Sequence, residues 1–130
     1  MDGRQEIIRL AEEIKATRKI LIALGDEMRQ HLILVMMQSG ECSGMRVNDI
    51  AEKTSLSRPA VSHHLQILKD AGIVKMRREG TRNYYYFDAD MEAFDRLIDM
   101  LTHAKAIMQS LPDRSGSVTL HPAPPFDRSV

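Results

Sequence analysis

Residues 54–72 read TSLSRPAVSHHLQILKDAG, and this stretch decides the fold. Ser57 is a typical helix N-cap, and Pro59 suits the first helical turn, where the missing amide donor is not needed. The apolar residues that follow recur at the spacing i, i+4 and i+7 and would form one buried stripe: Val61, Leu65 and Leu68. Gly72 is a typical left-handed residue at a helix C-terminus. The stretch therefore predicts a tight turn followed by a helix over 58–71 with a polar outer face.

The segments on either side of this helix predict a shorter helix and a β-hairpin. Upstream, Val47, Ile50 and Ala51 begin a short helix, which the turn over 54–57 separates from the longer one. Downstream, the hydrophobic period changes from 3.6 to 2 over residues 73–87, which indicates two strands with a charged tip between them. Helix, turn, helix and hairpin in this order predict a winged helix-turn-helix, a mainly helical fold with one small hairpin.

Three further amphipathic segments surround this unit. Residues 4–24 predict one long helix, and residues 26–38 predict a helix that is apolar on most faces and therefore central. A last helix follows the hairpin and ends near residue 111. The apolar stripes of the first and last helices exceed the needs of so small a core, which predicts a homodimer through them. We expect one domain over 1–111 and a flexible, proline-containing tail over 112–130.

Charge is segregated along the chain. The 130 residues include 18 basic and 18 acidic side chains, so the formal net charge is zero. Residues 46–82, however, contain eight basic residues against four acidic ones, and the segments on both sides are net acidic. Because the basic segment coincides with the predicted helix-turn-helix and hairpin, the pattern indicates double-stranded DNA as a partner.

The polar outer face and the hairpin supply the candidate DNA contacts. Side chains at the start of the helix over 58–71 can hydrogen-bond to base edges in a major groove, and the hairpin can reach phosphates or the neighbouring minor groove. The candidate residues are Ser55, Ser57, Arg58, Pro59, Ser62, His63, Gln66, Arg77, Arg78, Thr81, Arg82 and Tyr84. We expect His64, adjacent to His63 but about 100° away around the helix, to be packed or to cap.

The same segments resemble a known family. The motifs are ALGDEMR at 23–29, DIA at 49–51, LSRPAVSHHL at 56–65, LKDAGIV at 68–74, and REG at 78–80 before three tyrosines. They are similar to the ArsR/SmtB family of bacterial winged-helix repressors over about residues 20–110. The resemblance implies a homodimer built on the first and last helices, binding to an operator, and release of DNA when an inducer binds.

The sensing residues of that family are absent at the matching positions. Members that sense thiophilic metals have a Cys-x-Cys pair where this chain has Arg46 and Asn48. Members that sense zinc or nickel use more ligands on the last helix than the Asp99 and His103 found here, and zinc needs three or four. We therefore expect no metal and no other cofactor, and we expect Asp99 and His103 to be solvated or salt-bridged. Cys42, the single cysteine, remains a candidate redox switch or an inert small residue.

The sequence favours a DNA-binding repressor and does not identify its inducer. One alternative is a redox-responsive or atypical metal-responsive repressor of the same fold, and another is a winged helix used for protein contacts. An enzyme is not expected, because we find no nucleophile with a base, no phosphate-binding loop and no paired carboxylates. The longest apolar run is too short to cross a bilayer and the first residues are charged, so we expect a cytoplasmic protein without membrane contact.

Overall fold

The computed structural model describes residues 2–40 and 43–112, and this part of the chain holds six helices and one two-stranded sheet. In chain order the elements are α1 (Gly3–Ala16), α2 (Arg18–Leu24), α3 (Glu27–Gln38), α4 (Val47–Thr54), α5 (Arg58–Asp70), β1 (Val74–Glu79), β2 (Arg82–Phe87) and α6 (Met91–Ser110). The predicted mainly helical winged helix-turn-helix is confirmed. The tail predicted over 112–130 lies, except for Pro112, outside the described residues.

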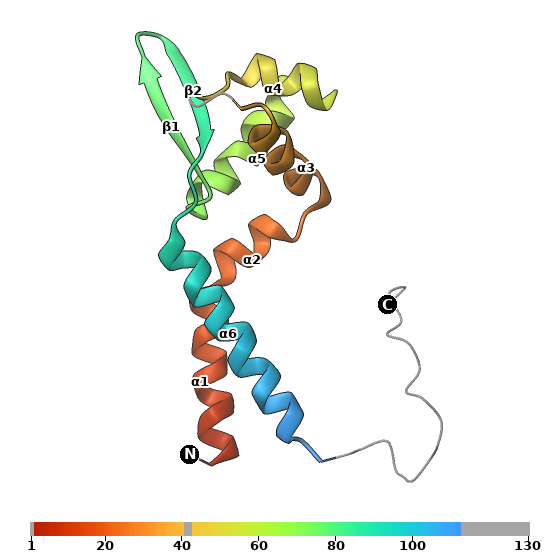
Figure 1. Cartoon of the computed structure of the whole chain (residues 1–130), viewed down its shortest axis with the longest axis vertical. Helices are drawn as coiled ribbons and strands as arrows, with labels where there is room; N and C mark the ends of the chain where they lie inside the picture. The colour runs from red at the N-terminus through yellow and green to blue at the C-terminus, as the bar shows by residue number, and fades with distance from the viewer. Residues whose placement is uncertain (1, 41–42, 113–130) are drawn as a thin grey trace, which may run out of the picture.

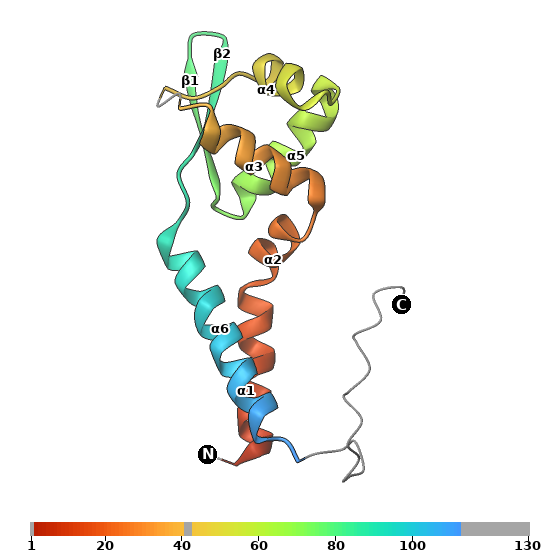
Figure 2. The same cartoon turned by 45° about the vertical axis from the view of Figure 1, so that its right-hand side comes forward.

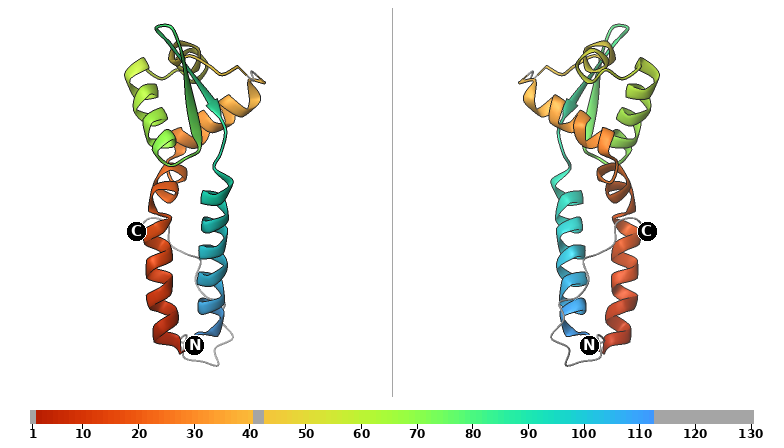
Figure 3. Two further views of the ribbon diagram at one scale, coloured as in Figure 1. Left: turned by 90° about the vertical axis from the view of Figure 1, so that its left-hand side faces the viewer. Right: turned by 90° about the vertical axis from the view of Figure 1, so that its right-hand side faces the viewer.

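The elements form two regions. Helices α1 and α6 run antiparallel beside each other and form a stalk, as Figure 1 and both views of Figure 3 show. Helices α3, α4 and α5 and the hairpin form a head at one end of the stalk, and α2 leads from the stalk into the head (Figure 2). In the part of the chain that the model describes, no helix is both long and apolar enough to span a membrane.

Side-chain caps fix where several helices begin. The Asp26 carboxylate accepts a hydrogen bond from the Arg29 backbone N at 3.0 Å, and the Ser57 hydroxyl accepts one from the Ala60 backbone N at 3.2 Å. Both acceptors satisfy amides that have no partner within the helix. Ser57 is the capping residue that the sequence predicted. Gly72, with a φ of +78°, follows the end of α5 as predicted.

The prediction of one long helix over 4–24 is wrong, because the chain breaks at Thr17. The Thr17 hydroxyl donates to the carbonyl oxygens of Glu13 and Ile14, at 2.9 and 3.2 Å, and the residue is 3% exposed. A hydroxyl bonded back to the preceding turn competes with helix geometry. The break lets α1 follow α6 in the stalk while α2 turns into the head, where Ile20 and Ala23 are buried.

Helix α3 is central to the head, as predicted, because it packs against α2, α4, α5 and β2. Only one face of it is buried, through Leu32 and Met36, whereas Leu34 and Met37 are 54% and 55% exposed. The core of the head lies between α3, α4, α5 and β1, where the largest fully buried side chains meet: Leu32, Ile50, Leu65, Leu68, Ile73, Val61 and Val74. All three residues of the predicted stripe on α5 belong to this core.

Arg29 is a buried charged residue that joins α2, α3 and α5. Its side chain donates to the carbonyl oxygens of Ala23 and Ile22, at 3.0 and 2.9 Å, and so satisfies the C-terminal end of α2. A third nitrogen lies 3.4 Å from Nδ1 of His64. His64 is therefore packed against Arg29, as expected, and its ring helps to fix the back of α5.

Candidate nucleic-acid interface

Helix α5 presents a polar face directly opposite its buried stripe. Val61, Leu65 and Leu68 have no exposed surface, whereas Ser62, His63 and Gln66 are exposed. Arg58 and Pro59 are exposed in the first turn. The predicted candidates on α5 thus lie together at the surface, where hydroxyl, imidazole, amide and guanidinium groups are available for hydrogen bonds.

The turn before α5 sets the direction of this helix. Ser55 has a φ of +60°, a left-handed conformation that is uncommon outside glycine, and it ends α4. Leu56 then packs against the core, and Ser57 caps α5. Ser55 and Ser57 are both exposed, immediately before the start of α5. The turn is therefore both the structural joint and a part of the candidate surface.

Two polar groups on α5 already have neighbours. The side-chain amide of Gln66 donates to the Asp70 carboxylate at 2.9 Å, one turn further along the helix. The rings of His63 and His64 have centroids 5.8 Å apart and planes tilted by 55°. Because His64 faces Arg29, only His63 of the two imidazoles lies on the exposed face, as the sequence predicted.

The hairpin, or wing, consists of β1 and β2 paired from Val74 opposite Phe87 to Glu79 opposite Arg82. Arg78, Thr81 and Arg82 are exposed near its tip, and the Arg78 Nε donates to the Gly80 carbonyl oxygen at 3.1 Å. At the base of the wing, Lys75 donates to Asp88 at 2.8 Å, and this hydrogen bond raises the pKa of Lys75. The tip therefore has exposed polar side chains, and the base is held by an ion pair.

Arg77 on β1 contacts both β2 and the segment before α4. Its guanidinium donates to the Ser43 carbonyl oxygen at 2.7 Å and to Glu79 at 2.9 Å. It also lies over the ring of Tyr84, with its central carbon 5.2 Å from the ring centroid. Arg77 and Tyr84 were predicted as DNA contacts, and the structure shows that both side chains take part in contacts within the protein.

A cleft joins the wing to the helix-turn-helix. It has a volume of about 160 Å³ and is lined by Arg46, Val47, Asn48, Arg58, Thr81, Arg82 and Asn83. Beside it, a wider hollow of about 460 Å³ is lined by Val47, Arg58, Pro59 and Ser62. Arg46, Asn48 and Asn83 were not among the candidates predicted from the sequence. Arg46 and Asn48 belong to the basic segment over 46–82, which was a signal, but only the folded chain brings them and Asn83 beside Arg58.

Asp99 and His103, which were not expected to bind a metal, both lie on α6. Cys42 is outside the described residues. His103, on α6, contacts the carboxylates of Glu13 and Glu6 on α1, with 3.5 Å between its Nε2 and Glu6, so its ring connects the two helices of the stalk. Asp99 is exposed. Over residues 2–40 and 43–112, no group of three or more His, Cys, Asp or Glu side chains is arranged to hold a metal ion.

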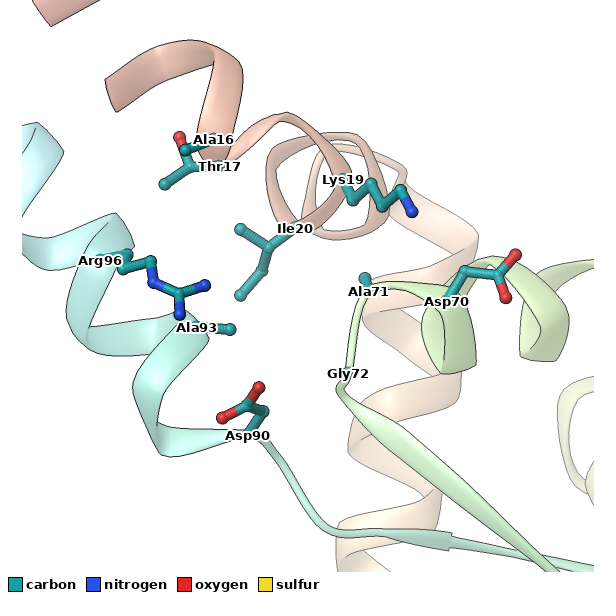
Figure 4. Close-up of a pocket in the computed structure, with 10 residues that line it drawn as sticks. All are labelled: Ala16, Thr17, Lys19, Ile20, Asp70, Ala71, Gly72, Asp90, Ala93 and Arg96. Carbon is teal, nitrogen blue, oxygen red and sulfur yellow. The ribbon is translucent and has the colours of Figure 1, made fainter. Parts of the chain in front are cut away.

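Another cavity, of about 200 Å³, lies where the stalk meets the head. Figure 4 shows the charged side chains that line it: Lys19, Asp70, Asp90 and Arg96. Three of these have partners in the protein, since Asp70 accepts from Gln66, Asp90 caps α6 and Arg96 pairs with Glu92 at 2.7 Å. The cavity offers charges of both signs and lies at the C-terminal end of α5, away from the cleft.

Comparisons with known proteins agree with this architecture. Residues 29–76 match the family described as "Bacterial regulatory protein, arsR family". An uncharacterized HTH-type transcriptional regulator from Methanocaldococcus jannaschii is 37% identical over 91 residues, which span 69% of this chain and 99% of that protein. The transcriptional repressor SdpR from Bacillus subtilis is 40% identical over 63 residues, which span 48% of this chain and 66% of SdpR.

Among solved structures, a homodimeric winged helix-turn-helix DNA-binding domain from Mycobacterium bovis is 28% identical to this chain. It is described as a possible ArsR-family transcriptional regulator, has a TM-score of 0.50, and covers 76% of this chain and 83% of its own length. Similarity along nearly the whole M. jannaschii regulator, together with the match through the turn and α5, shows that the chain belongs to the ArsR family of bacterial regulatory proteins.

Proposed function

We propose that this ArsR-family chain is a homodimeric transcriptional repressor that binds double-stranded DNA through α5 and the wing. One observation carries the proposal: α5 exposes a polar face whose opposite side is fully buried, and this face adjoins a cleft with three arginines. A helix anchored in this way can enter a major groove, while the wing reaches the backbone or the adjacent minor groove. SdpR, which this chain resembles, is itself named a transcriptional repressor.

The proposed DNA contacts are the exposed candidates on the turn, α5 and the wing tip: Ser55, Ser57, Arg58, Pro59, Ser62, His63, Gln66, Arg78, Thr81 and Arg82. Arg77 and Tyr84 are assigned a supporting role, because the Arg77 guanidinium is bound to Ser43 and Glu79 and lies over Tyr84. In this arrangement Gln66 leaves its hydrogen bond with Asp70 to meet a base edge, adenine being the base that a glutamine amide matches best.

The stalk supports the dimer. Both of its helices carry large exposed apolar side chains, namely Ile7, Ile8, Ile14, Ile98, Leu101 and Met108. These apolar side chains are removed from water when two stalks pack into a four-helix arrangement. The M. bovis domain is homodimeric by its description. With two-fold symmetry the two copies of α5 would lie one DNA turn apart, roughly 34 to 36 Å, on a near-palindromic site.

Fluorescence anisotropy tests the function directly. We would titrate the protein into labelled DNA from upstream of its own gene, and into a scrambled duplex, at several salt concentrations. We expect tighter binding to the native sequence and affinity that falls as salt rises, because phosphate contacts release counterions. Arg58→Ala with Gln66→Ala should abolish the preference, whereas Arg9→Ala, on the exposed side of the stalk, should leave it intact.

Two results would contradict this function. Weak and equal binding to both duplexes would exclude a sequence-specific repressor. Binding without salt dependence would indicate that few phosphates are neutralised, and the winged helix would then serve protein contacts instead. An unchanged sequence preference in the Arg58 and Gln66 double variant would show that α5 does not read the operator.

A further inference from the structure

The cleft between the wing and the helix-turn-helix concentrates positive charge from three separate elements. Arg46 precedes α4, Arg58 begins α5 and Arg82 begins β2, and all three line the same volume of about 160 Å³. The other lining residues are Val47, Asn48, Thr81 and Asn83, so no acidic side chain lines the cleft. Three like charges around so small a space repel one another unless an anion lies between them.

The three arginines of the cleft have no acidic partner among the described residues, as is also true of Arg4, Arg18 and Arg78, which do not line this cleft. Arg29, Arg77 and Arg96 each form an ion pair with a carboxylate. None of the salt bridges within residues 2–40 and 43–112 involves Arg46, Arg58 or Arg82. Asp49 is the acidic residue nearest to Arg46 along the chain. Its carboxylate accepts a hydrogen bond from the Arg46 backbone N at 3.4 Å, at the start of α4. Their charge is therefore left for a ligand.

The backbone holds the cleft in shape before any ligand arrives. Met45 and Tyr85 exchange two backbone hydrogen bonds, of 2.7 and 2.8 Å, which fasten the segment before α4 to the middle of β2. Arg77 adds a hydrogen bond from β1 to the Ser43 carbonyl oxygen. Arg46 follows Met45 directly, so this attachment sets its position beside the wing. A site that is already assembled loses little entropy when it binds.

We propose that this cleft binds one phosphate group of the DNA backbone, held by Arg46, Arg58 and Arg82 together. A phosphodiester offers an anionic centre with several oxygens, and the donors around the cleft are guanidinium groups, the amides of Asn48 and Asn83 and the Thr81 hydroxyl. A base edge offers at most two acceptors in one plane, which three arginines would not share. Arg58 also lines the adjoining hollow with Pro59 and Ser62, so the same strand can continue along α5.

The assignment rests on the proposed function. It adds Arg46, which lies outside α5, to the proposed DNA contacts. The phosphate would lie between the groove that α5 enters and the groove that the wing approaches. Its role would be to fix the position of the head on DNA without reading sequence. Loss of Arg46 should therefore weaken binding to every duplex by the same factor, in contrast to loss of Gln66 on the exposed face of α5.

Arg46→Gln tests the proposal, with Lys53→Gln as the matched control because Lys53 is an exposed basic residue in the last turn of α4. We expect Arg46→Gln to bind native and scrambled duplexes about tenfold more weakly, and the slope of log affinity against log salt to become shallower by about 2, one for each protomer of the dimer. Arg46→Lys should retain the slope and recover part of the affinity. Thermal unfolding of each variant establishes that it is folded.

Duplexes with one methylphosphonate locate the phosphate. Neutralising a single phosphate should weaken binding by the wild-type protein at one position in each half-site, and Arg46→Gln should be insensitive at the same positions. The assignment would be overturned if Arg46→Gln kept the affinity and salt slope of the wild type, or if it lost affinity only for the native sequence. It would also be overturned if the effects of Arg46→Gln and of each methylphosphonate were additive at every phosphate. None of these results would contradict the proposed function. A wild-type protein that binds neither duplex would overturn both.

Inorganic phosphate tests whether the cleft serves a free anion instead. Thermal unfolding would be followed with phosphate replacing chloride at constant ionic strength. Because the cleft is assembled before DNA binds, phosphate should raise the Tm of the wild type slightly more than that of Arg46→Gln. A rise in Tm seen only with the wild type, together with DNA affinity that Arg46→Gln leaves unchanged, would assign the cleft to a free anion and overturn the assignment to DNA.

Discussion

Met45 and Tyr85 form an isolated pair of backbone hydrogen bonds, 2.7 and 2.8 Å long, between the segment that precedes α4 and the wing. Through this pair, the strand β2 is held to the helix-turn-helix as well as to its partner β1. The wing therefore cannot turn independently of α4 along this segment. The pair requires the two backbones to come close together, and Gly44 is the residue that permits it.

Gly44→Ala should destabilise the protein. Gly44 has a φ of +98°, and an added Cβ would lie 3.0 Å from the Tyr85 carbonyl oxygen and 3.2 Å from the Tyr84 Cβ. Backbone strain and the close contact together should lower the free energy of unfolding by about 2–3 kcal/mol, measured by urea titration at one protomer concentration. Gly40→Ala is the control, since Gly40 has a φ of +66° with open space around it, and about 1 kcal/mol is expected. Equal losses in the two variants would show that the approach to the wing is not responsible.

Arg29→Met should lower the free energy of unfolding by more than the small difference in side-chain volume suggests. Arg29 is 8% exposed and donates to the carbonyl oxygens of Ile22 and Ala23, which would be left without these donors. Loss of two hydrogen bonds from a charged donor predicts a decrease of about 3 kcal/mol in the free energy of unfolding. Arg18→Met, at an exposed position of α2, should change it by less than about 0.5 kcal/mol. Similar values for the two variants would mean that solvent replaces Arg29.

The parts of the fold that sequence predicted correctly are those with local signals. Ser57 caps an amide three residues away, Gly72 ends the helix that it follows, and the stripe on α5 repeats within a few turns. The change of period at the wing is equally local. Each of these features depends on neighbours in sequence, so the local order of residues is sufficient to predict it.

The features that sequence did not predict depend on distant partners. Thr17 breaks the first helix where α2 begins to pack against α5, more than forty residues later in the chain. Arg77 was predicted as a DNA contact, and its partner Ser43 is 34 residues away. Arg46 joins Arg58 and Arg82 only because Met45 pairs with Tyr85. No periodic pattern encodes such pairs, and a buried arginine such as Arg29 reads in sequence as an ordinary surface charge.

Asp26 should make stability depend on pH in the acid range. A hydrogen bond from the Arg29 backbone N, supported by the Arg29 charge, holds the pKa of Asp26 below its ordinary value of 3.8. The folded state therefore favours the ionised carboxylate, so this stabilisation is complete above the ordinary value and is lost as pH falls through the lowered one. Asn is as good an N-cap as Asp, so Asp26→Asn should match the wild type near pH 7 and lose less stability below about pH 4. Parallel urea midpoints for the two proteins across that range would contradict the role of Asp26.

Leu101→Lys should dissociate the proposed dimer. Leu101 is 53% exposed on α6, near Ile98 at 57%, and a lysine there would place a charge in each stalk where two apolar faces meet. We expect light scattering to give the protomer mass for this variant at micromolar concentration, with the wild type at twice that mass, and DNA affinity to fall because the two half-sites are no longer bound together. Leu34→Lys is the matched control, since Leu34 is 54% exposed on α3, outside the stalk, and it should leave the mass unchanged. Dissociation by Leu34→Lys alone would move the interface from the stalk to α3, and a wild-type protein that is monomeric at this concentration would exclude the dimer itself.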